Sequence, residues 1–282
     1  MAELLLGKEV NGALNRRISD DVLRLKEKGI VPTLAILRVG ENPGDLAYER
    51  GAKKRCEALG VECTVITFDE NVLQEELLSC IDRINHDDKI HGVLLLRPLP
   101  RHLDASVIEN AVSAEKDVDC MTDLSISGVF SGRNIGYPPC TAQACIEILD
   151  HYGIDCTGKK AVVVGRSLVV GKPVSMMLLQ KNATVTICHT RTKDLSSVTK
   201  DADILIVAAG KAGVIGAEHV REGQIVIDVG INTDEDGKLC GDVKFSEAEK
   251  VAGYITPVPG GVGSVTTSVL VRHVVDAAMR RN

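Results

Sequence analysis

A glycine-containing turn between an apolar stretch and a helix-like stretch is the first place where this sequence could do chemistry. Residues 162–164 are all valine, and residues 165–173 read Gly-Arg-Ser-Leu-Val-Val-Gly-Lys-Pro. The amide groups and the dipole at such a helix start favour a phosphate group. The spacing is Gly-x₅-Gly, and Ser167 stands where Gly-x-Gly-x-x-Gly would place its second glycine. The turn predicts a nucleotide site with Gly165, Arg166 and Ser167 in it, and a plain strand-to-helix turn is the alternative.

The end of the next predicted strand indicates which dinucleotide would bind. In an NAD site, a carboxylate about 20 residues after the turn accepts a hydrogen bond from the ribose 2′-hydroxyl. In an NADP site, a cation at that position binds the 2′-phosphate. Residues 189–192 read His-Thr-Arg-Thr and contain no acid. We therefore prefer NADP to NAD, with Thr190, Arg191 and Arg166 as candidate contacts. An ordinary solvated charge is the alternative for Arg191.

Two blocks of alternating helix-like and strand-like stretches would position these groups. In the first block, the patterns predict helices over 10–28, 46–59 and 72–85, and strands over 32–39, 63–68 and 90–96. In the second they predict helices over 141–152, 172–181 and 264–279, and strands over 160–164, 183–188, 202–208, 224–229 and 253–258. Residues 111–140 have an irregular pattern. This alternation predicts an α/β fold whose parallel sheets are covered on both faces.

Length and charge narrow the class of protein. With 282 residues, of which 44% are hydrophobic, the chain has material for two domains. The net charge of −6 argues against a nucleic-acid partner, which a basic excess would favour. No apolar run reaches the about 18 residues of a membrane span, and no basic region precedes the short apolar run at the N-terminus. We expect a soluble cytoplasmic protein without a membrane partner.

The nine cysteines do not suggest a disulfide framework or a metal site. Their number is odd, and no two have Cys-x-x-Cys spacing. We expect small buried thiols and no bound metal.

Several motifs in the same order resemble one known family. They are Val39-Gly40-x-Asn42-Pro43, Lys116-Asp117-Val118-Asp119, the turn at 165–173, Ala183-Thr184-Val185-Thr186-x-x-His189, Asp228-Val229-Gly230-Ile231-Asn232 and Thr256-Pro257-Val258-Pro259-Gly260-Gly261-Val262-Gly263. On these motifs the whole chain resembles the methylenetetrahydrofolate dehydrogenase/cyclohydrolase (FolD) family.

The resemblance implies two α/β domains flanking a cleft, the second a Rossmann-like doubly wound parallel sheet. Residues 1–140, completed by a C-terminal helix over 264–282, would form the folate-binding domain, and residues 141–263 the NADP-binding domain. It also implies a homodimer formed through the nucleotide domains. The reaction it implies is oxidation of 5,10-methylenetetrahydrofolate by NADP⁺, followed by hydrolysis of the methenyl cation to 10-formyltetrahydrofolate.

The resemblance also assigns site residues. Asp119 matches the aspartate that binds folate, and a carboxylate can accept paired hydrogen bonds from the pterin amide and amine. Tyr48 matches the tyrosine beside the pterin ring. Ile231 would contact the cofactor, and Pro259, Gly260 and Gly261 would contact the substrate.

Two departures from the family affect the hydrolysis step. The family places a lysine four residues after the tyrosine, where this chain has Ala52, and a glutamine that orients it, where this chain has Leu96. If only one of the two polar residues were lost, the other would be buried without its hydrogen-bond partner. Because both are replaced by apolar residues here, no such unpaired group remains. Lys53 and Lys54 point about 100° or more away from that helix face and are poor substitutes.

The leading hypothesis is an NADP-dependent methylenetetrahydrofolate dehydrogenase whose cyclohydrolase activity is weak or absent. Three alternatives stay open from the sequence. They are a fully bifunctional enzyme, an oxidoreductase acting on a substrate other than folate, and a non-catalytic dinucleotide-binding paralogue.

Overall fold

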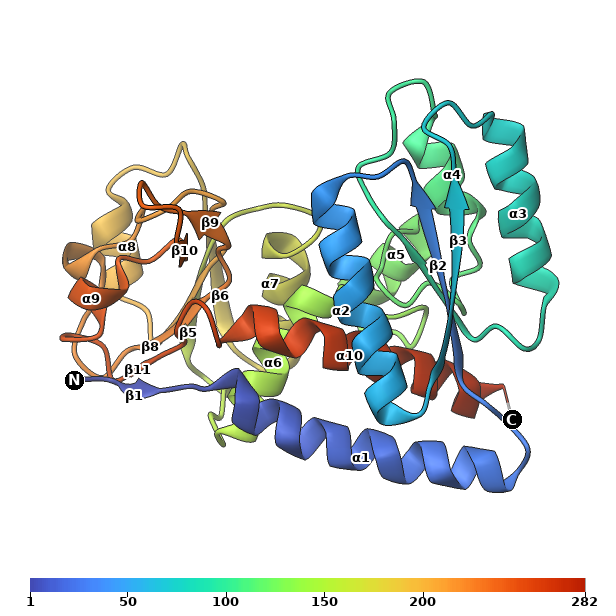
Figure 1. The fold of residues 1–282 in the computed structure, drawn as a ribbon. Helices are drawn as coiled ribbons and strands as arrows, with labels where there is room; N and C mark the ends of the chain where they lie inside the picture. Colours follow the sequence, from blue (N-terminus) through green and yellow to red (C-terminus); the bar gives the residue numbers. More distant parts are fainter. Residues whose placement is uncertain (282) are drawn as a thin grey trace. The chain divides into compact units, whose positions relative to one another are not determined.

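The structure, a computed structural model, describes residues 1–281. The chain divides into two compact units (Figure 1). The six-stranded unit consists of residues 1–13 and 141–266. The three-stranded unit consists of residues 14–140 and of the described chain from 267 onward. Each unit is described by itself below.

The six-stranded unit contains a fully parallel sheet. Its strands, in spatial order, are β1 (Glu3–Leu4), β11 (Tyr254–Ile255), β8 (Ile225–Asp228), β7 (Ile204–Val207), β5 (Lys160–Val164) and β6 (Thr184–Cys188). Strands β5, β7 and β8 are almost entirely buried, as expected where both faces of a parallel sheet are covered. The other elements are α6 (Cys140–His151), α7 (Gly171–Gln180), α8 (Leu195–Lys200), the 3₁₀ turn η1 (Ala217–His219), α9 (Phe245–Ala248), and an antiparallel pair of β9 (Asn232–Thr233) and β10 (Leu239–Cys240).

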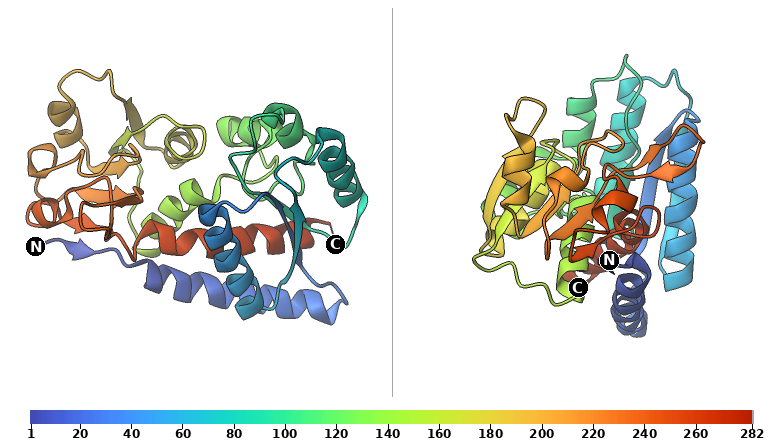
Figure 2. Two further views of the ribbon diagram at one scale, coloured as in Figure 1. Left: turned by 45° about the horizontal axis from the view of Figure 1, so that its top comes forward. Right: turned by 90° about the vertical axis from the view of Figure 1, so that its left-hand side faces the viewer.

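The three-stranded unit contains a parallel sheet in the order β3 (Glu62–Phe68), β2 (Thr33–Val39) and β4 (Gly92–Leu95). Its helices include α2 (Pro43–Leu59), α3 (Gln74–His86), α4 (Ala105–Ala111) and α5 (Asp123–Ser131). Figures 1 and 2 show α2 on one side of this sheet and α3 on the other. Alternate residues of β2, among them Ala35 and Leu37, pack with Leu77 and Ile81 of α3.

Two long helices contribute residues to both units. They are α1 (Gly7–Glu27) and α10 (Val262–Arg280). In the six-stranded unit, Asn11 Nδ2 donates to the carbonyl oxygen of Ser264 over 2.8 Å. In the three-stranded unit, Arg272 forms an ion pair with Asp21 at 2.6 Å.

The first residues of the chain cluster with the second half of the sequence, which differs from the predicted domain ranges. We expected residues 1–140 to form one domain, but residues 1–13 belong to the six-stranded unit. The reason is that β1 pairs in parallel with β11, with Glu3 opposite Tyr254. Strand β1 is too short to have a sequence pattern from which this pairing could be predicted.

The region 111–140, predicted to be irregular, contains helix α5. The side chain of Thr122 caps its start by accepting from Ser125 N, and Gly132 at φ +68° ends it. Gly128 lies inside this helix, where a Cβ would stand 2.1 Å from the carbonyl oxygen of Ile135. Glycine weakens the helical pattern of this stretch in the sequence, but at position 128 it is required for close packing.

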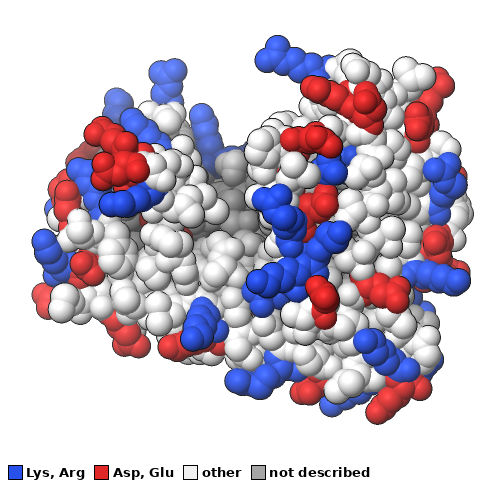
Figure 3. Space-filling model, in the orientation of Figure 1, with Lys and Arg blue, Asp and Glu red and all other residues white. Residues whose placement is uncertain are grey.

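On the face drawn in Figure 3, acidic and basic side chains are interspersed, and a group of basic ones covers α2. Helix α2 carries the exposed side chains of Arg50, Lys53 and Lys54. Among the described residues, none of the helices is both long and apolar enough to cross a membrane.

Candidate functional site

The predicted nucleotide turn lies where the strand order of the six-stranded sheet reverses. From β5 the chain continues to β6 on one side, and then returns to β7 on the other side of β5. Open α/β sheets bind ligands at the carboxyl ends of the strands at such a point. Gly165 follows β5 with φ +134°, and a Cβ there would stand 2.1 Å from the carbonyl oxygen of Ala208, just after β7. Only glycine therefore fits this position.

Ser167 fills the space above the start of α7 with its own hydroxyl group. Its Oγ accepts from Val170 N at 3.1 Å and from Gly171 N at 3.4 Å. These amides lie at the helix start, where such donors commonly bind a phosphate group. Gly171 is needed for close packing, because a Cβ would stand 2.3 Å from the carbonyl oxygen of Gly165. The side chain of Arg166 is exposed beside this turn.

The loop after β6 is adjacent to this turn in the sheet. Val164 at the end of β5 is in register with Cys188 at the end of β6, so both loops leave the same edge. His189 N donates to Thr192 Oγ1 over 2.8 Å, and Arg191 N donates to His189 Nδ1 over 3.1 Å. The loop is thus ordered by its own hydrogen bonds. Thr190 and Arg191 are exposed, and Arg191 has no ion pair within the part of the chain that the structure describes.

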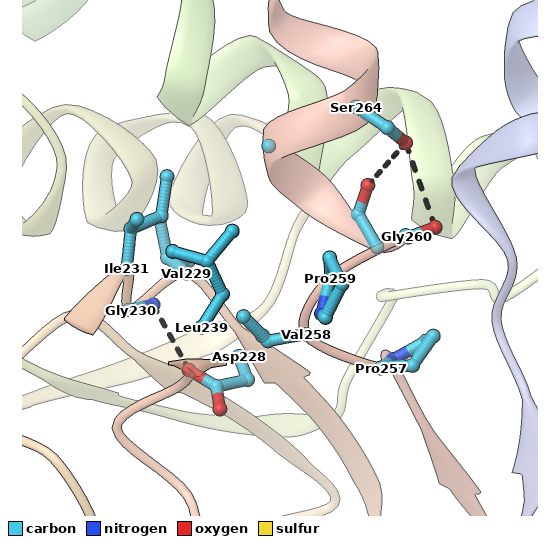
Figure 4. Close-up of a pocket in the computed structure, with 12 residues that line it drawn as sticks. Asp228, Val229, Gly230, Ile231, Leu239, Pro257, Val258, Pro259, Gly260 and Ser264 are labelled. Carbon is cyan, nitrogen blue, oxygen red and sulfur yellow. Dashed lines mark hydrogen bonds between the residues drawn. The ribbon is translucent and has the colours of Figure 1, made fainter. Parts of the chain in front are cut away.

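A pocket of about 290 Å³ follows β8 and β11 at the same edge of the sheet (Figure 4). Ile231, predicted to contact the cofactor, and Pro259, Gly260 and Gly261, predicted to contact the substrate, line it together. Val229, Leu239 and Val258 give it apolar walls, while the amide of Gly230 donates to Asp228 (Figure 4). Such a lining suits a flat, weakly polar ring.

Two buried carboxylates, to which the sequence analysis assigned no role, hold the backbone around this pocket. Asp228 accepts from the amides of Gly230, Asp242 and Val243 at 2.9–3.0 Å. Asp242 accepts from the amides of residues 209–211 at 2.6–3.0 Å and from Asn232 Nδ2 at 2.9 Å. Burial is the main cause that raises the pKa of Asp228 to about 6, although its three amide partners oppose it. The loop after β7, with its tightly held amides, is the part of this site that sequence reasoning missed.

In the three-stranded unit, Asp119 lies at the end of a segment that runs beside β4. Val93 and Asp117 form a parallel bridge, and Val93 N donates to the carbonyl oxygen of Lys116 over 2.7 Å. Asp119 Oδ1 accepts from Cys140 N at 3.1 Å, and Oδ2 is 4.0 Å from Nη2 of Arg97. The side chain of Asp119 is 21% exposed, so a ligand can reach it. Burial raises its pKa, against the opposing hydrogen bonds from Cys140 and the charge of Arg97.

The neighbours of Asp119 in its motif are structural. The fully buried Lys116 donates from Nζ to the carbonyl oxygens of Ile84 at 2.5 Å and Asp87 at 2.7 Å, at the end of α3. Asp117 accepts from the amides of Met121 and Thr122, both at 2.9 Å. The first three residues of the motif are therefore buried, and only Asp119 is partly exposed.

Tyr48 lies near enough to Asp119 for the charge of Asp119 to act on it. Tyr48 lies on α2 and is half-buried. Its pKa is raised well above the usual value, first by burial and then by the negative charge of Asp119. Its hydroxyl group therefore stays protonated and can donate.

Ala52 and Leu96, the two departures from the family pattern, are both buried. Ala52 lies one helical turn after Tyr48 on α2, and Leu96 directly follows β4. Lys53 and Lys54 are exposed, as expected from their positions around the helix. Neither position 52 nor position 96 supplies a polar side-chain atom.

Among residues 1–281, no group of three or more His, Cys, Asp or Glu side chains could hold a metal ion. The nine cysteines are free thiols, seven of them buried.

Comparisons with known proteins identify the family. Residues 5–119 match the model of the tetrahydrofolate dehydrogenase/cyclohydrolase catalytic domain, and residues 139–282 match the model of its NAD(P)-binding domain. The chain belongs to the tetrahydrofolate dehydrogenase/cyclohydrolase family. The catalytic-domain match includes Tyr48 and Asp119, and the NAD(P)-binding match includes the turn at Gly165 and the pocket at Ile231.

Relatives in this family match over the whole chain. A Clostridium botulinum protein named bifunctional protein FolD is 50% identical over 282 residues, covering all of both chains. The crystal structure of the bifunctional enzyme FolD from Campylobacter jejuni is 41% identical and superimposes with a TM-score of 0.97, covering all of both chains. The Trypanosoma brucei FolD structure, complexed with NADP cofactor and inhibitor, is 34% identical with a TM-score of 0.92, covering 99% of this chain and 98% of that one. The predicted two-domain α/β fold is thereby confirmed.

Proposed function

We propose that this protein oxidises 5,10-methylenetetrahydrofolate to the 5,10-methenyl cation with NADP⁺, and hydrolyses that cation weakly or not at all. One observation carries the proposal: the unit that contains Asp119 and Tyr48 has apolar, buried side chains at Ala52 and Leu96. The outward carboxylate of Asp119 suits a ring edge that offers two N–H donors.

The dehydrogenase step needs little from side chains beyond placement. The lone pairs of the two folate nitrogens expel a hydride from the carbon between them, and NADP⁺ supplies its acceptor. Asp119 and Tyr48 would bind and orient the pterin, and the turn at 165–171 would bind the dinucleotide. The apolar lining of the pocket at Ile231 excludes water from a bound ring.

The hydrolysis step needs more. Water attacks the cation and must lose a proton, so a placed acceptor accelerates the step. Removing an amine and its amide partner from positions 52 and 96 removes such a group. A loss of about 10²–10⁴-fold in the hydrolysis rate is the usual effect of losing one general acid–base group.

The test follows both products during turnover. With methylenetetrahydrofolate and NADP⁺, we expect methenyltetrahydrofolate to accumulate, and then to disappear no faster than without enzyme. The variant Ala52→Lys/Leu96→Gln should gain hydrolysis, because it restores the amine and the amide that orients it.

A matched control separates chemistry from packing. Ala52→Met/Leu96→Gln has a side chain of similar length at position 52 but no amine, and we expect no gain from it. Rapid release of 10-formyltetrahydrofolate by the unmodified protein would instead identify a fully bifunctional enzyme.

NADP is the dinucleotide that the residues favour. Arg166 and Arg191 are exposed near the carboxyl ends of β5 and β6, and residues 189–192 include no carboxylate that would repel a 2′-phosphate. We expect Arg191→Ser to lower kcat/KM for NADP⁺ by about 10-fold or more, the usual effect of losing one charge-assisted hydrogen bond. The same variant should leave kcat/KM for NAD⁺ nearly unchanged. Steady-state kinetics with both dinucleotides measures this, and an equal loss for both would assign Arg191 to structure.

A homodimer formed through the nucleotide-binding domains stays a prediction. Light scattering should then give twice the 30.2 kDa of one chain.

A further inference from the structure

Arg97 is a partly buried cation in the site around Asp119 that the mechanism above does not use. It follows Leu96 at the carboxyl end of β4, and its side chain is 27% exposed. The backbone pairing with β2 continues past β4, since Leu96 N donates to the carbonyl oxygen of Leu37 over 3.0 Å. Position 97 therefore directly follows the last residue that is paired with β2.

The hydrogen-bonding groups of Arg97 are largely unused. Its Nη1 lies 3.8 Å from Glu109 Oε1, and its Nη2 lies 4.0 Å from Asp119 Oδ2. Both distances are too long for hydrogen bonds, and a guanidinium carries five N–H donors. Within the described residues these two ion pairs are its only polar partners, so its donors can serve a ligand.

The surroundings of Arg97 favour a neutral acceptor over an anion. Two carboxylates, Glu109 and Asp119, already face its single positive charge. A third negative group would be repelled by both, whereas a carbonyl oxygen would not. A guanidinium cannot lose its proton near neutral pH, so Arg97 cannot replace the missing proton acceptor either.

We propose that Arg97 is a specificity residue of the pterin site, donating a hydrogen bond to the ring carbonyl oxygen beside the N–H groups that Asp119 accepts. This inference rests on the proposed function. In a pterin, the carbonyl at C4 directly adjoins the N3–H group. One carboxylate and one cation a few ångströms apart can therefore bind both the N–H donors and the carbonyl oxygen of this edge. Asp119 recognises the donors, and Arg97 recognises the acceptor.

The experiment compares two ligands that differ along this edge. Folic acid has the 4-oxo group and N3–H, whereas its 4-amino analogue has a donor at C4 and an unprotonated N3. The contribution of Arg97 is therefore taken from the change that its replacement causes for each ligand. We expect the unmodified protein to prefer folic acid in calorimetric titrations. Arg97→Leu should lower the affinity for folic acid by about tenfold or more and leave that for the 4-amino analogue within about twofold. Arg97→Lys, which keeps one charged donor, should retain part of the preference.

Controls make the result interpretable. Arg101→Leu removes an exposed arginine from the same loop and should change neither affinity. NADP⁺ binding to each variant reports on the six-stranded unit and should be unchanged. An equal loss for both folate ligands in Arg97→Leu would overturn the inference, because a merely structural role has that effect.

Failure of the inference is distinct from failure of the proposed function. If the unmodified protein oxidises methylenetetrahydrofolate and Arg97→Leu does so with unchanged KM, only the role of Arg97 is refuted. If the unmodified protein neither binds these folates nor oxidises methylenetetrahydrofolate, the proposed function falls and the role of Arg97 falls with it.

Discussion

At the scale of single residues, burial raises the pKa of Asp228, one of the two carboxylates that hold the pocket loops. Asp228 lies close enough to Asp242 for the charge of Asp242 to oppose its ionisation, and burial is the larger effect. Its pKa of about 6 exceeds the about 3.9 of an unfolded chain. The folded protein therefore binds more protons than the unfolded one in the interval between these values. The stabilising contribution of this titration is complete below about pH 4 and is lost as the pH rises through about 6.

The variant Asp228→Asn tests this, because asparagine does not titrate. We expect the variant to be less stable than the unmodified protein, since its amide cannot accept from all three neighbouring N–H groups. The difference in the free energy of unfolding should be largest in acid and shrink by about 1 kcal/mol between about pH 5 and pH 8. Urea denaturation at several pH values measures it. A difference that does not change with pH would place the pKa of Asp228 outside this range.

Single residues differ in how well the sequence predicts them. Asp119 and Tyr48 are assigned by the resemblance to the family, and the charge of Asp119 acts on Tyr48 in the structure. Arg97, Asp242 and His273 could not be predicted, because their roles depend on partners far along the chain. His273, for example, lies within 2.9 Å of the carbonyl oxygen of Val118, 155 residues away in sequence.

At the scale of elements, the turn after β5 depends on one glycine. We expect Gly165→Ala to cost about 3 kcal/mol of stability or more and to abolish NADP⁺ binding, because the new methyl group would meet the carbonyl oxygen of Ala208. Gly158→Ala is the matched control, since Gly158 also has a positive φ, +72°, but nothing lies within 4 Å of the new Cβ. The control should cost about 1 kcal/mol. Thermal unfolding and NADP⁺ titration of both variants check this, and equal effects would show that backbone strain alone matters.

Elements could be predicted where apolar periodicity is unbroken. Strand β5 has the predicted bounds, 160–164, and the helices of the first block begin and end within a few residues of prediction. Helix α5 and strand β1 could not be predicted in this way. Gly128 within α5 is required because the carbonyl group of Ile135 packs against it. Strand β1 is only two residues long and forms because it pairs with β11.

At the scale of the whole molecule, the N-terminal segment is a structural part of the nucleotide-binding half. Leu5 is fully buried, and its amide donates to the carbonyl oxygen of Ile255 over 2.9 Å. Next to it, Leu6 N donates to the hydroxyl oxygen of Tyr152 over 2.7 Å, and Gly7 N donates to the carbonyl oxygen of Gly260 over 2.9 Å. These contacts join the start of the chain to the loop that lines the pocket at Ile231.

Leu5→Ala should therefore weaken the six-stranded unit, although position 5 lies at the beginning of the sequence. We expect a cost of about 3 kcal/mol from the lost burial and the cavity, and weaker NADP⁺ binding. Leu4→Ala is the matched control, because Leu4 is 41% exposed and its truncation should cost about 0.5 kcal/mol or less. Hydrogen exchange locates the effect: amides of β8 and β11 should lose protection, while those of β2 and β4 keep it. Loss of protection confined to β2 and β4 would instead show that the N-terminal residues stabilise the three-stranded unit, as their place in the sequence suggested.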